Sequence, residues 1–549
     1  MPKREHLVLC GGVQERSASG RHVVRLNLHG STANVRLRIS DIAQKLLVSV
    51  PDRLLDLIEI ATYVYAADGA ISRGGPTDRE MGAHWRRSLV FRIPVRQPEL
   101  WGSEPLSSGL AETLSFLSDE QYAFEFVALN DPPPLAAYLE FTPTGETTFS
   151  PDEVILFSGG LDSFSGAVEE VIGRRNKVVL VSHRSDPKVA EARKQLVEGL
   201  RKRAGYDRVL HVPVLATLTG KLNVEPTHRT RSFLFAALGA AIGRLFGLDR
   251  LRFFENGVVS LNLPPVEQVV GVRATRTTHP QALAGFRRIL AAALGVPIDV
   301  SNPFLWLTKA EVIRQIAGHE CADLIRYTRS CTRVRDMTIL HPHCGKCSQC
   351  IDRRFSILAA GQAADDPADA YNVELFTGER PPGPDREMAL AYVRSASKVA
   401  RMDDEAFFAE FGEVSRFVGY FPEPADLVAT QVLNLHRRHA STVCRIFDDA
   451  ISQHASALRE GSLPECCLLV LKLSRDDRAR VEPQLSRAAQ LTIPPTPEIR
   501  IAIDADRRRV VFDGWGELTG AGAELIIALA GPFGPAEGAR AGTLPIHKK

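Results

Sequence analysis

The stretch Val154-Ile155-Leu156-Phe157-Ser158-Gly159-Gly160-Leu161-Asp162-Ser163 decides the fold of the chain around it. Its apolar first part contains two β-branched residues and predicts a buried strand that ends at the glycine pair. Residues 164–171 have the apolar pattern of an amphipathic helix, so the glycines lie at a strand-to-helix turn. Glycine lets the backbone approach a ligand closely, and the N–H groups at a helix start favour an anion.

The polar side chains of this turn suit the phosphates of a nucleotide. Two serine hydroxyls act as donors, and the carboxylate of Asp162 could hold Mg²⁺. The turn is not a Walker A loop, because no Gly-Lys-Ser/Thr follows it. It resembles instead the PP-loop of ATP pyrophosphatases, which cleave ATP to AMP and pyrophosphate while adenylating a substrate. That resemblance implies ATP contacts from Ser158, Gly159, Gly160, Leu161, Asp162 and Ser163. The simpler alternative is a Gly-Gly turn in which Asp162 or Ser163 caps the helix.

Length and composition indicate a multidomain globular protein. A chain of 549 residues is too long for a single hydrophobic core. With a charged content of 24% and a net charge of +2, the chain as a whole has no electrostatic attraction to nucleic acid or membrane. The first apolar stretch is too short for a signal peptide, and no apolar run has the length of a membrane span. Nine cysteines, four of them close together, suit metal binding in a reducing compartment. We therefore expect a cytoplasmic protein that binds neither membrane nor nucleic acid.

The first 150 residues predict an α+β accessory domain without a βαβ unit. No catalytic group of residues stands out in this segment. We expect it to fold as a domain separate from the segment that follows. The predicted strands are 23–28, 35–39, 88–95 and 122–129, and the predicted helices are 51–69 and 108–117.

Residues 151–372 alternate strand and helix patterns, which predicts a parallel sheet with helices on both faces. The second strand is expected at 177–184, a helix at 189–200 and the third strand at 209–214. Ligands of such sheets bind at the carboxyl ends of the strands, where Ser182 and His183 could contact adenine and ribose. A solvated loop position is the alternative for His183.

Two basic positions precede predicted helices. Arg231 stands just before an apolar helix that begins at residue 233, where a cation opposes the helix dipole. A phosphate or carboxylate partner would explain it, so we assign Arg231 to the ATP site. Arg276 lies in a second basic loop and is assigned to substrate binding.

A cysteine cluster follows. Short Cys-x-x-Cys spacings let thiolates from one turn reach a single tetrahedral ion, which predicts a structural zinc site. The predicted ligands are Cys331, Cys344, Cys347 and Cys350. Disulfides are the alternative, and the spacing leaves open that His341 or His343 replaces one cysteine.

These motifs, taken in order, resemble the QueC family of 7-cyano-7-deazaguanine synthases. The resemblance covers residues 151 to about 361: the PP-loop, the arginine-rich entry to an apolar helix, the stretch 303–312 and the cysteine set followed by Arg353. The family converts 7-carboxy-7-deazaguanine with ATP to an acyl-adenylate and pyrophosphate, and an amine then displaces AMP. A second ATP can dehydrate the resulting amide to a nitrile.

The resemblance implies ATP, Mg²⁺ and Zn²⁺ as cofactors and specific roles for several side chains. Asp162, Ser163 and Lys309 are expected to act in catalysis, and Arg353 is expected to hold the purine-like ring or the carboxylate. The stretch 272–280 stands where the family frames its deazaguanine pocket.

After a Pro/Gly-rich linker, the remaining chain predicts a helical accessory domain at 385–492, which includes a short helix at 483–491. The last segment, 493–549, predicts a hairpin of strands 499–504 and 509–512 and a helix at 520–529. Larger QueC-like proteins occur in anti-phage gene clusters, and this architecture resembles them. We therefore expect the amine to belong to a partner protein encoded nearby, with its N-terminal amine as the candidate nucleophile, and a homodimer is compatible with the sequence. Ammonia and nitrile formation, an idle PP-loop scaffold and a tRNA-thiolating enzyme remain alternatives.

Overall fold

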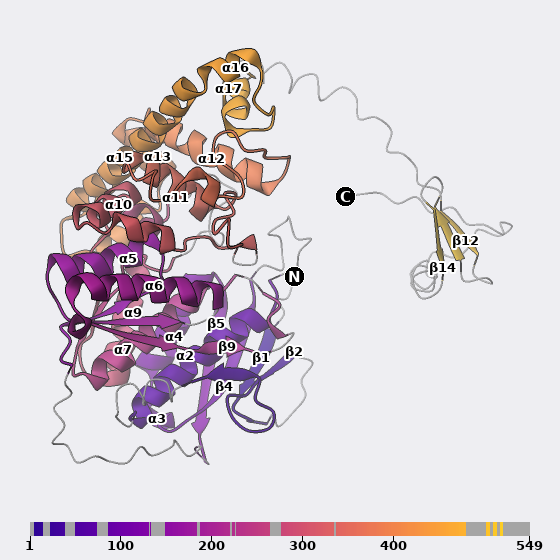
Figure 1. Cartoon of the computed structure of the whole chain (residues 1–549). Helices are drawn as coiled ribbons and strands as arrows, with labels where there is room; N and C mark the ends of the chain where they lie inside the picture. Colours follow the sequence, from indigo (N-terminus) through magenta and orange to yellow (C-terminus); the bar gives the residue numbers. More distant parts are fainter. Residues whose placement is uncertain are drawn as a thin grey trace. The chain divides into compact units, whose positions relative to one another are not determined.

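The computed structural model divides the chain into two compact units, residues 1–472 and residues 473–549 (Figure 1). The residues that the structure describes are 5–14, 22–38, 50–73, 86–130, 132, 149–183, 187–219, 222–225, 227–263, 276–333, 336–478, 501–504, 509–512 and 516–519.

A five-stranded parallel sheet forms the centre of the first unit, in the order β11-β10-β6-β7-β8. Its strands are β6 (Glu153–Leu156), β7 (Val178–His183), β8 (Val209–Val214), β10 (Arg250–Arg252) and β11 (Asp299–Ser301). The chain leaves β6 toward β7 and β8, then returns to the other side of β6 as β10 and β11. The order therefore reverses between β6 and β10, the position at which doubly wound sheets bind ligands. The predicted parallel α/β sheet is confirmed, although β10 and β11 were not predicted.

Helices cover both faces of this sheet. One face carries α7 (Arg231–Leu245) and α9 (Pro280–Leu294), whose apolar side chains share a core with Leu156 and Val179. The other face carries α5 (Leu161–Val168), α6 (Pro187–Ala204) and α10 (Lys309–Gly318), packed around Phe157 and Leu180. Shorter helical turns are the π-helix Glu169–Gly173, α8 (Gly257–Leu261) and the 3-10 turns Tyr206–Arg208, Ala322–Tyr327, Ala368–Ala370 and Val418–Tyr420.

The N-terminal segment is a second parallel sheet, in the order β2-β1-β4-β5. Its elements are β1 (Glu5–Cys10), β2 (His22–Leu26), α2 (Asp52–Ala70), β4 (Ser88–Val95), α3 (Pro98–Trp101), α4 (Glu104–Ser118) and β5 (Gln121–Ala128). Because β4 and β5 are parallel and joined through α4, they form a βαβ unit, so the α+β prediction for this segment is wrong. The short strand β3 (Val35–Leu37) pairs antiparallel with β9 (Ala216–Leu218) of the central segment.

The N-terminal and central segments share one apolar core. Helix α2 packs against α7, and α4 packs against α9. Every residue of α2 from Asp56 to Gly69 is buried, because one side faces its own sheet and the other faces the central helices. Residues 1–150 were predicted to form a separate domain, whereas the structure places them in one compact unit with the residues up to 472. Figure 1 shows α2, α4, α7 and α9 grouped together beside the strands of the N-terminal sheet.

The helices after residue 384 form a third apolar cluster, which includes Ile351 and Phe355 of α11 (Ser348–Ala359). They are α12 (Pro384–Val399), α13 (Asp404–Glu410), α14 (Val414–Phe417), α15 (Ala425–Gln453), α16 (Ala455–Glu460) and α17 (Leu468–Arg478). The mainly helical prediction for this region is confirmed, and the helix predicted at 483–491 lies outside the described residues.

The second unit contains an antiparallel sheet of β12 (Ile501–Asp504), β13 (Arg509–Phe512) and β14 (Gly516–Thr519). This matches the predicted hairpin, while the helix predicted at 520–529 lies outside the described residues. Across the described part of the chain, no helix combines the length and the apolar character that a membrane crossing requires.

Candidate nucleotide site and cysteine cluster

The backbone of the loop between β6 and α5 requires glycine at its tightest point. Gly159 has a φ of +82°, and a Cβ atom there would lie 2.5 Å from the Cγ of Arg193. Its carbonyl accepts a hydrogen bond from the backbone N–H of Arg329 at 2.8 Å. The segment leading to the cysteine cluster therefore lies directly against the loop.

The two serines hold the loop in shape. The Oγ of Ser163 lies 3.0 Å from the Oγ of Ser158 and accepts the N–H of Gly159 at 3.2 Å. The N–H of Gly160 donates to the Oγ of Ser158. The first N–H groups of α5 have no acceptor within the helix, so they are oriented for an anion.

Asp162 joins the two strands at which the sheet order reverses. Its Oδ1 accepts hydrogen bonds from the backbone N–H and the side-chain amide of Asn256, at 3.2 and 3.0 Å. Asn256 follows β10 and caps α8. The Oδ2 of Asp162 lies 3.5 Å from the Nζ of Lys309. Catalytic residues predicted from distant parts of the sequence thus meet at the carboxyl edge of the sheet.

Lys309 is a buried ammonium held between two carboxylates. It is the first residue of α10, which starts with a capping box of Thr308 and Glu311. Its Nζ lies 2.8 Å from the Oδ2 of Asp352 and only 2% of its side chain is exposed. Burial alone would lower the pKa of Lys309, but the charges of Asp162 and Asp352 outweigh it and raise the pKa above its usual range. The ammonium therefore stays charged.

A second carboxyl group, Glu255, lies at the same edge of the sheet. Burial raises the pKa of Glu255 to about 7; a hydrogen bond from Thr278 opposes the shift, and the charge of Asp162 adds to it. The charge of Arg231 lowers the same pKa, which places Arg231 within electrostatic reach of the site. The guanidinium of Arg231 lies 5.8 Å from the ring centroid of Phe235, and the residue is exposed.

Two predicted nucleotide contacts, Ser182 and His183, have other partners in the structure. Ser182 is fully buried, and its Oγ lies 2.8 Å from the Nε2 of His211. His183 is buried against Tyr65, hydrogen-bonds the carbonyl of Ala216, and has a pKa lowered to about 3 by burial. Both side chains point into the protein core, which contradicts their assignment to adenine and ribose.

Arg276 also differs from its predicted role. Its Nη1 donates to the carbonyl of Phe116 at 2.7 Å, and the guanidinium lies 4.8 Å from the ring centroid of that residue. It therefore joins the loop before α9 to the N-terminal segment in place of a substrate.

Arg353 is buried with no exposed surface, and its guanidinium is saturated by protein acceptors. The Nη2 lies 2.7 Å from Asp366 and also donates to the carbonyl of Ile325, while the Nη1 donates to Thr328 at 2.7 Å. A guanidinium with its donors used in this way has a structural role, so the predicted substrate contact is contradicted.

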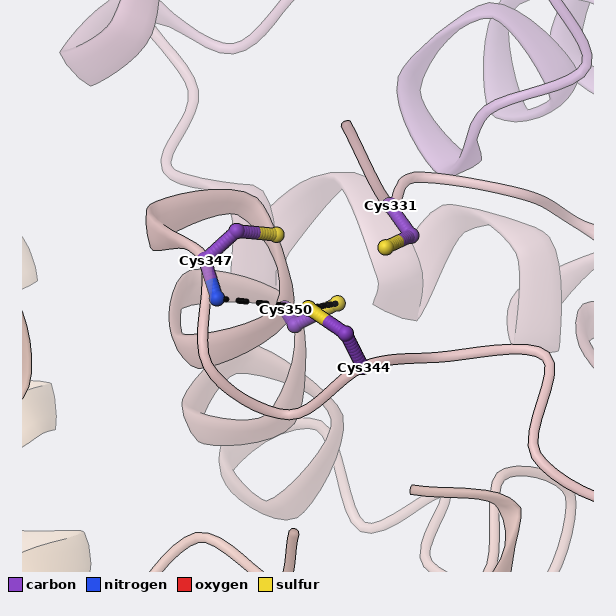
Figure 2. A group of neighbouring side chains, drawn as sticks. All are labelled: Cys331, Cys344, Cys347 and Cys350. Carbon is purple, nitrogen blue, oxygen red and sulfur yellow. Dashed lines mark hydrogen bonds between the residues drawn. The ribbon is translucent and has the colours of Figure 1, made fainter. Parts of the chain in front are cut away.

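The four predicted metal ligands come together. The sulfur atoms of Cys331, Cys344, Cys347 and Cys350 all lie within 4.8 Å of one another and are buried (Figure 2). The sulfurs of Cys344 and Cys350 are 3.8 Å apart, and none of the nine cysteines forms a disulfide. Two thiolates on a tetrahedral zinc with bonds of about 2.3 Å would be about 3.8 Å apart, whereas a disulfide needs about 2 Å. The cluster therefore fits a metal such as zinc, and the disulfide alternative is excluded.

The turn that carries the cluster is built for thiolates. The backbone N–H groups of Lys346 and Cys347 both point at the sulfur of Cys344, at 3.4 Å. Gly345 has a φ of +71°, and a Cβ atom there would lie 1.9 Å from the carbonyl of Val373.

Neither histidine near the cluster takes part in it. The Nδ1 of His341 bonds the carbonyl of Asp369, and His343 lies with its ring beside Tyr371 and its Nε2 3.6 Å from Asp366. The cluster of metal-ligand type found among the described residues consists of cysteines alone.

Sequence reasoning missed Asn256, Glu255 and Asp352. The first two belong to Phe253-Phe254-Glu255-Asn256-Gly257, an apolar run that ends in an acid and a turn residue. That pattern resembles the end of the predicted first strand and was the available signal. Asp352 gives no such signal, because its partner Lys309 lies on a different helix. A scan against protein-family models and a search of curated proteins each gave no match to this chain.

Proposed function

We propose that this chain is a QueC-like, ATP-dependent enzyme that adenylates a carboxylate and transfers the acyl group to an amine. The observation that carries the proposal is the meeting of Asp162, Lys309 and the glycine loop at the point where the sheet order reverses. Parallel sheets bind nucleotides at that point. The buried cysteine cluster supports the same family, since the loop and the cysteines occur in its order.

The residues fit ATP as substrate. The N–H groups at the start of α5 and the hydroxyl of Ser158, an exposed residue, suit phosphate oxygens. The ammonium of Lys309 lies behind the loop, where it can offset the negative charge that develops on departing pyrophosphate. Asp162 and Ser158 are the oxygen donors that would hold Mg²⁺, which would supply further charge neutralisation.

The substrate that we propose is 7-carboxy-7-deazaguanine. Its carboxylate oxygen attacks the α-phosphorus of ATP and pyrophosphate leaves, which gives an acyl-adenylate. An amine nitrogen then attacks the acyl carbon, AMP leaves with the acyl C–O bond electrons, the nitrogen loses a proton and an amide remains. We propose that a partner protein supplies the amine, because the chain has long folded flanks that ammonia would not require.

The decisive experiment incubates the protein with ATP, Mg²⁺ and carboxydeazaguanine and separates the nucleotide products. AMP and pyrophosphate are the expected products, and Ser163→Ala should reduce both while the fold persists. ADP as the product, or no turnover with any carboxylated deazapurine, would overturn the proposal. Intact-mass analysis of proteins encoded beside this chain then separates a protein acceptor from ammonia, which would yield the free nitrile and no added mass.

A further inference from the structure

A tyrosine from the C-terminal helices reaches the candidate active site through one intermediate residue. The Oη of Tyr392 on α12 donates to the Oδ1 of Asp352 at 2.8 Å. The Oδ2 of Asp352 lies 2.8 Å from the Nζ of Lys309, which lies 3.5 Å from the Oδ2 of Asp162. Each oxygen of Asp352 thus has a different partner, one on the C-terminal helices and one at the nucleotide loop.

Packing holds this tyrosine in one orientation. Its ring stacks on Phe355 with centroids 5.3 Å apart and meets the ring of His439 edge-on at 5.7 Å. Phe355 belongs to α11 and His439 to α15, so three helices fix the position of one hydroxyl group.

The four-carbon side chain of lysine is flexible and does not by itself fix the position of the ammonium group. A buried carboxylate that is itself held by a hydrogen bond can restrict the ammonium to one place. Asp352 does this only while its other oxygen is fixed, because a carboxylate without that bond can rotate about its own side-chain axis. The hydroxyl of Tyr392 therefore acts on Lys309 indirectly, through Asp352.

We infer that Tyr392 is a positioning residue that acts through Asp352 to hold the ammonium of Lys309 at the nucleotide loop. The C-terminal helices thereby complete the candidate active site. This inference rests on the proposed ATP site and assigns those helices a part in it that none of the sequence motifs indicates.

The test is a double-mutant cycle with Tyr392→Phe and Lys309→Met. The phenylalanine keeps the ring packing and removes only the hydroxyl. Two quantities are measured at one pH: the Kd of the α,β-methylene analogue of ATP, and the rate of AMP formation with carboxydeazaguanine. Tyr392→Phe alone should raise the Kd of the analogue, lower the rate of AMP formation, or do both, by roughly tenfold. This is the scale of one hydrogen bond to a charged group. In the Lys309→Met background it should have almost no further effect, because the group through which it acts is gone.

A matched control separates positioning from stability. Tyr122 is also buried and donates to a carboxylate, Glu120, at 3.0 Å, within the N-terminal segment. Tyr122→Phe should leave both quantities unchanged in the folded protein, and thermal unfolding is followed for every variant. If Tyr392→Phe does not fold, Asp352→Asn tests the same contact from its other side.

The outcomes discriminate between the two proposals. Coupling in analogue binding supports the inference even if no deazaguanine is turned over, which would overturn only the proposed substrate. Equal effects of Tyr392→Phe in both backgrounds, or no effect in either, would overturn the inference and leave the proposed function intact. Failure of the wild-type chain to bind the analogue would overturn both.

Discussion

Two regions of this chain bury charge in opposite ways. In the cysteine end, defined as the four cysteines with Arg353 and Asp366, the guanidinium of Arg353 meets a protein acceptor on each nitrogen. The loop site is defined as Asp162, Lys309, Asp352 and Glu255. Its ammonium pairs with the carboxylates of Asp352 and Asp162, at 2.8 and 3.5 Å. The helix start beside it keeps N–H groups without an intrahelical acceptor. A region whose polar groups are satisfied has a structural role, whereas one with unused donors is prepared for a ligand.

The largest effect should follow removal of the metal from the cysteine end. Structural zinc contributes about 10–16 kcal/mol of apparent binding free energy to folding in small zinc domains. A chelator, or Cys347→Ser, should therefore lower the melting temperature far more than Cys444→Ser, whose thiol lies outside the cluster. Elemental analysis should find one zinc per chain. If the metal-free protein had the same melting temperature, the cysteine end would not have the structural role that distinguishes it from the loop site.

Arg353→Met tests the saturated pair directly. Asp366 is buried, and loss of the guanidinium removes its charged partner and leaves the hydroxyl of Tyr371 as a neutral donor. We expect a loss of about 3–5 kcal/mol in the free energy of unfolding, measured by urea denaturation. The matched control is Arg203→Met, which breaks a partly exposed ion pair with Asp323 and should cost at most about 1 kcal/mol. Unchanged stability together with a raised KM for the carboxylate would restore the substrate role.

Asp162→Asn tests the loop site. It should reduce the reaction rate strongly and change the stability of the protein little. The amide fills the same space and Lys309 keeps Asp352 as partner, so stability should change by no more than about 1 kcal/mol. The rate of AMP formation should fall roughly 10²–10³-fold, the usual cost of losing one group that stabilises charge in the transition state. Asp323→Asn, at the exposed pair with Arg203, is the control. Equal rates in wild type and variant would exclude Asp162 from the reaction.

The same comparison shows which features the sequence could reveal. The loop and the cysteines were predictable because their chemistry lies within short stretches, where glycine conformation and ligand spacing are local properties. Arg353 was misassigned because the resemblance gave it a role from its place after the cysteine motif, whereas its partners Thr328 and Asp366 lie outside that motif. Burial, which decides whether a guanidinium can reach a ligand, is set by tertiary packing.

The fold prediction for the N-terminal segment was wrong for a related reason. Its strand and helix patterns were recognised at 88–95, 108–117 and 122–129, and they match β4, α4 and β5. Strand direction depends on pairing partners, and β1, one of the two inner strands of that sheet, was not recognised. Without it, the alternation that indicates a parallel sheet was hidden, and so was the shared core with α7 and α9.

The smallest expected effect concerns Glu255 and shows whether the loop site is partly desolvated. The pKa of Glu255 is raised from 4.5 to about 7, so the folded state binds this proton more tightly than the unfolded chain. The stabilising contribution is therefore complete below about pH 4.5 and is lost as the pH rises through about 7. The full difference corresponds to about 3 kcal/mol, and partial exposure of the side chain reduces it to about 1–3 kcal/mol.

Glu255→Gln replaces the protonated carboxyl with a neutral amide of similar shape. Between pH 5 and pH 8, roughly the range in which the wild-type group titrates, the variant should therefore gain stability relative to the wild type. Urea denaturation at four pH values across this range measures the difference, and Glu112→Gln, at an exposed ion pair with Arg288, serves as the control. A difference that stays constant with pH would mean that Glu255 is ionised in the folded state throughout. The loop site would then carry three carboxylates, those of Asp162, Asp352 and Glu255, against the single ammonium of Lys309, and the addition of Mg²⁺ should remove part of the resulting repulsion.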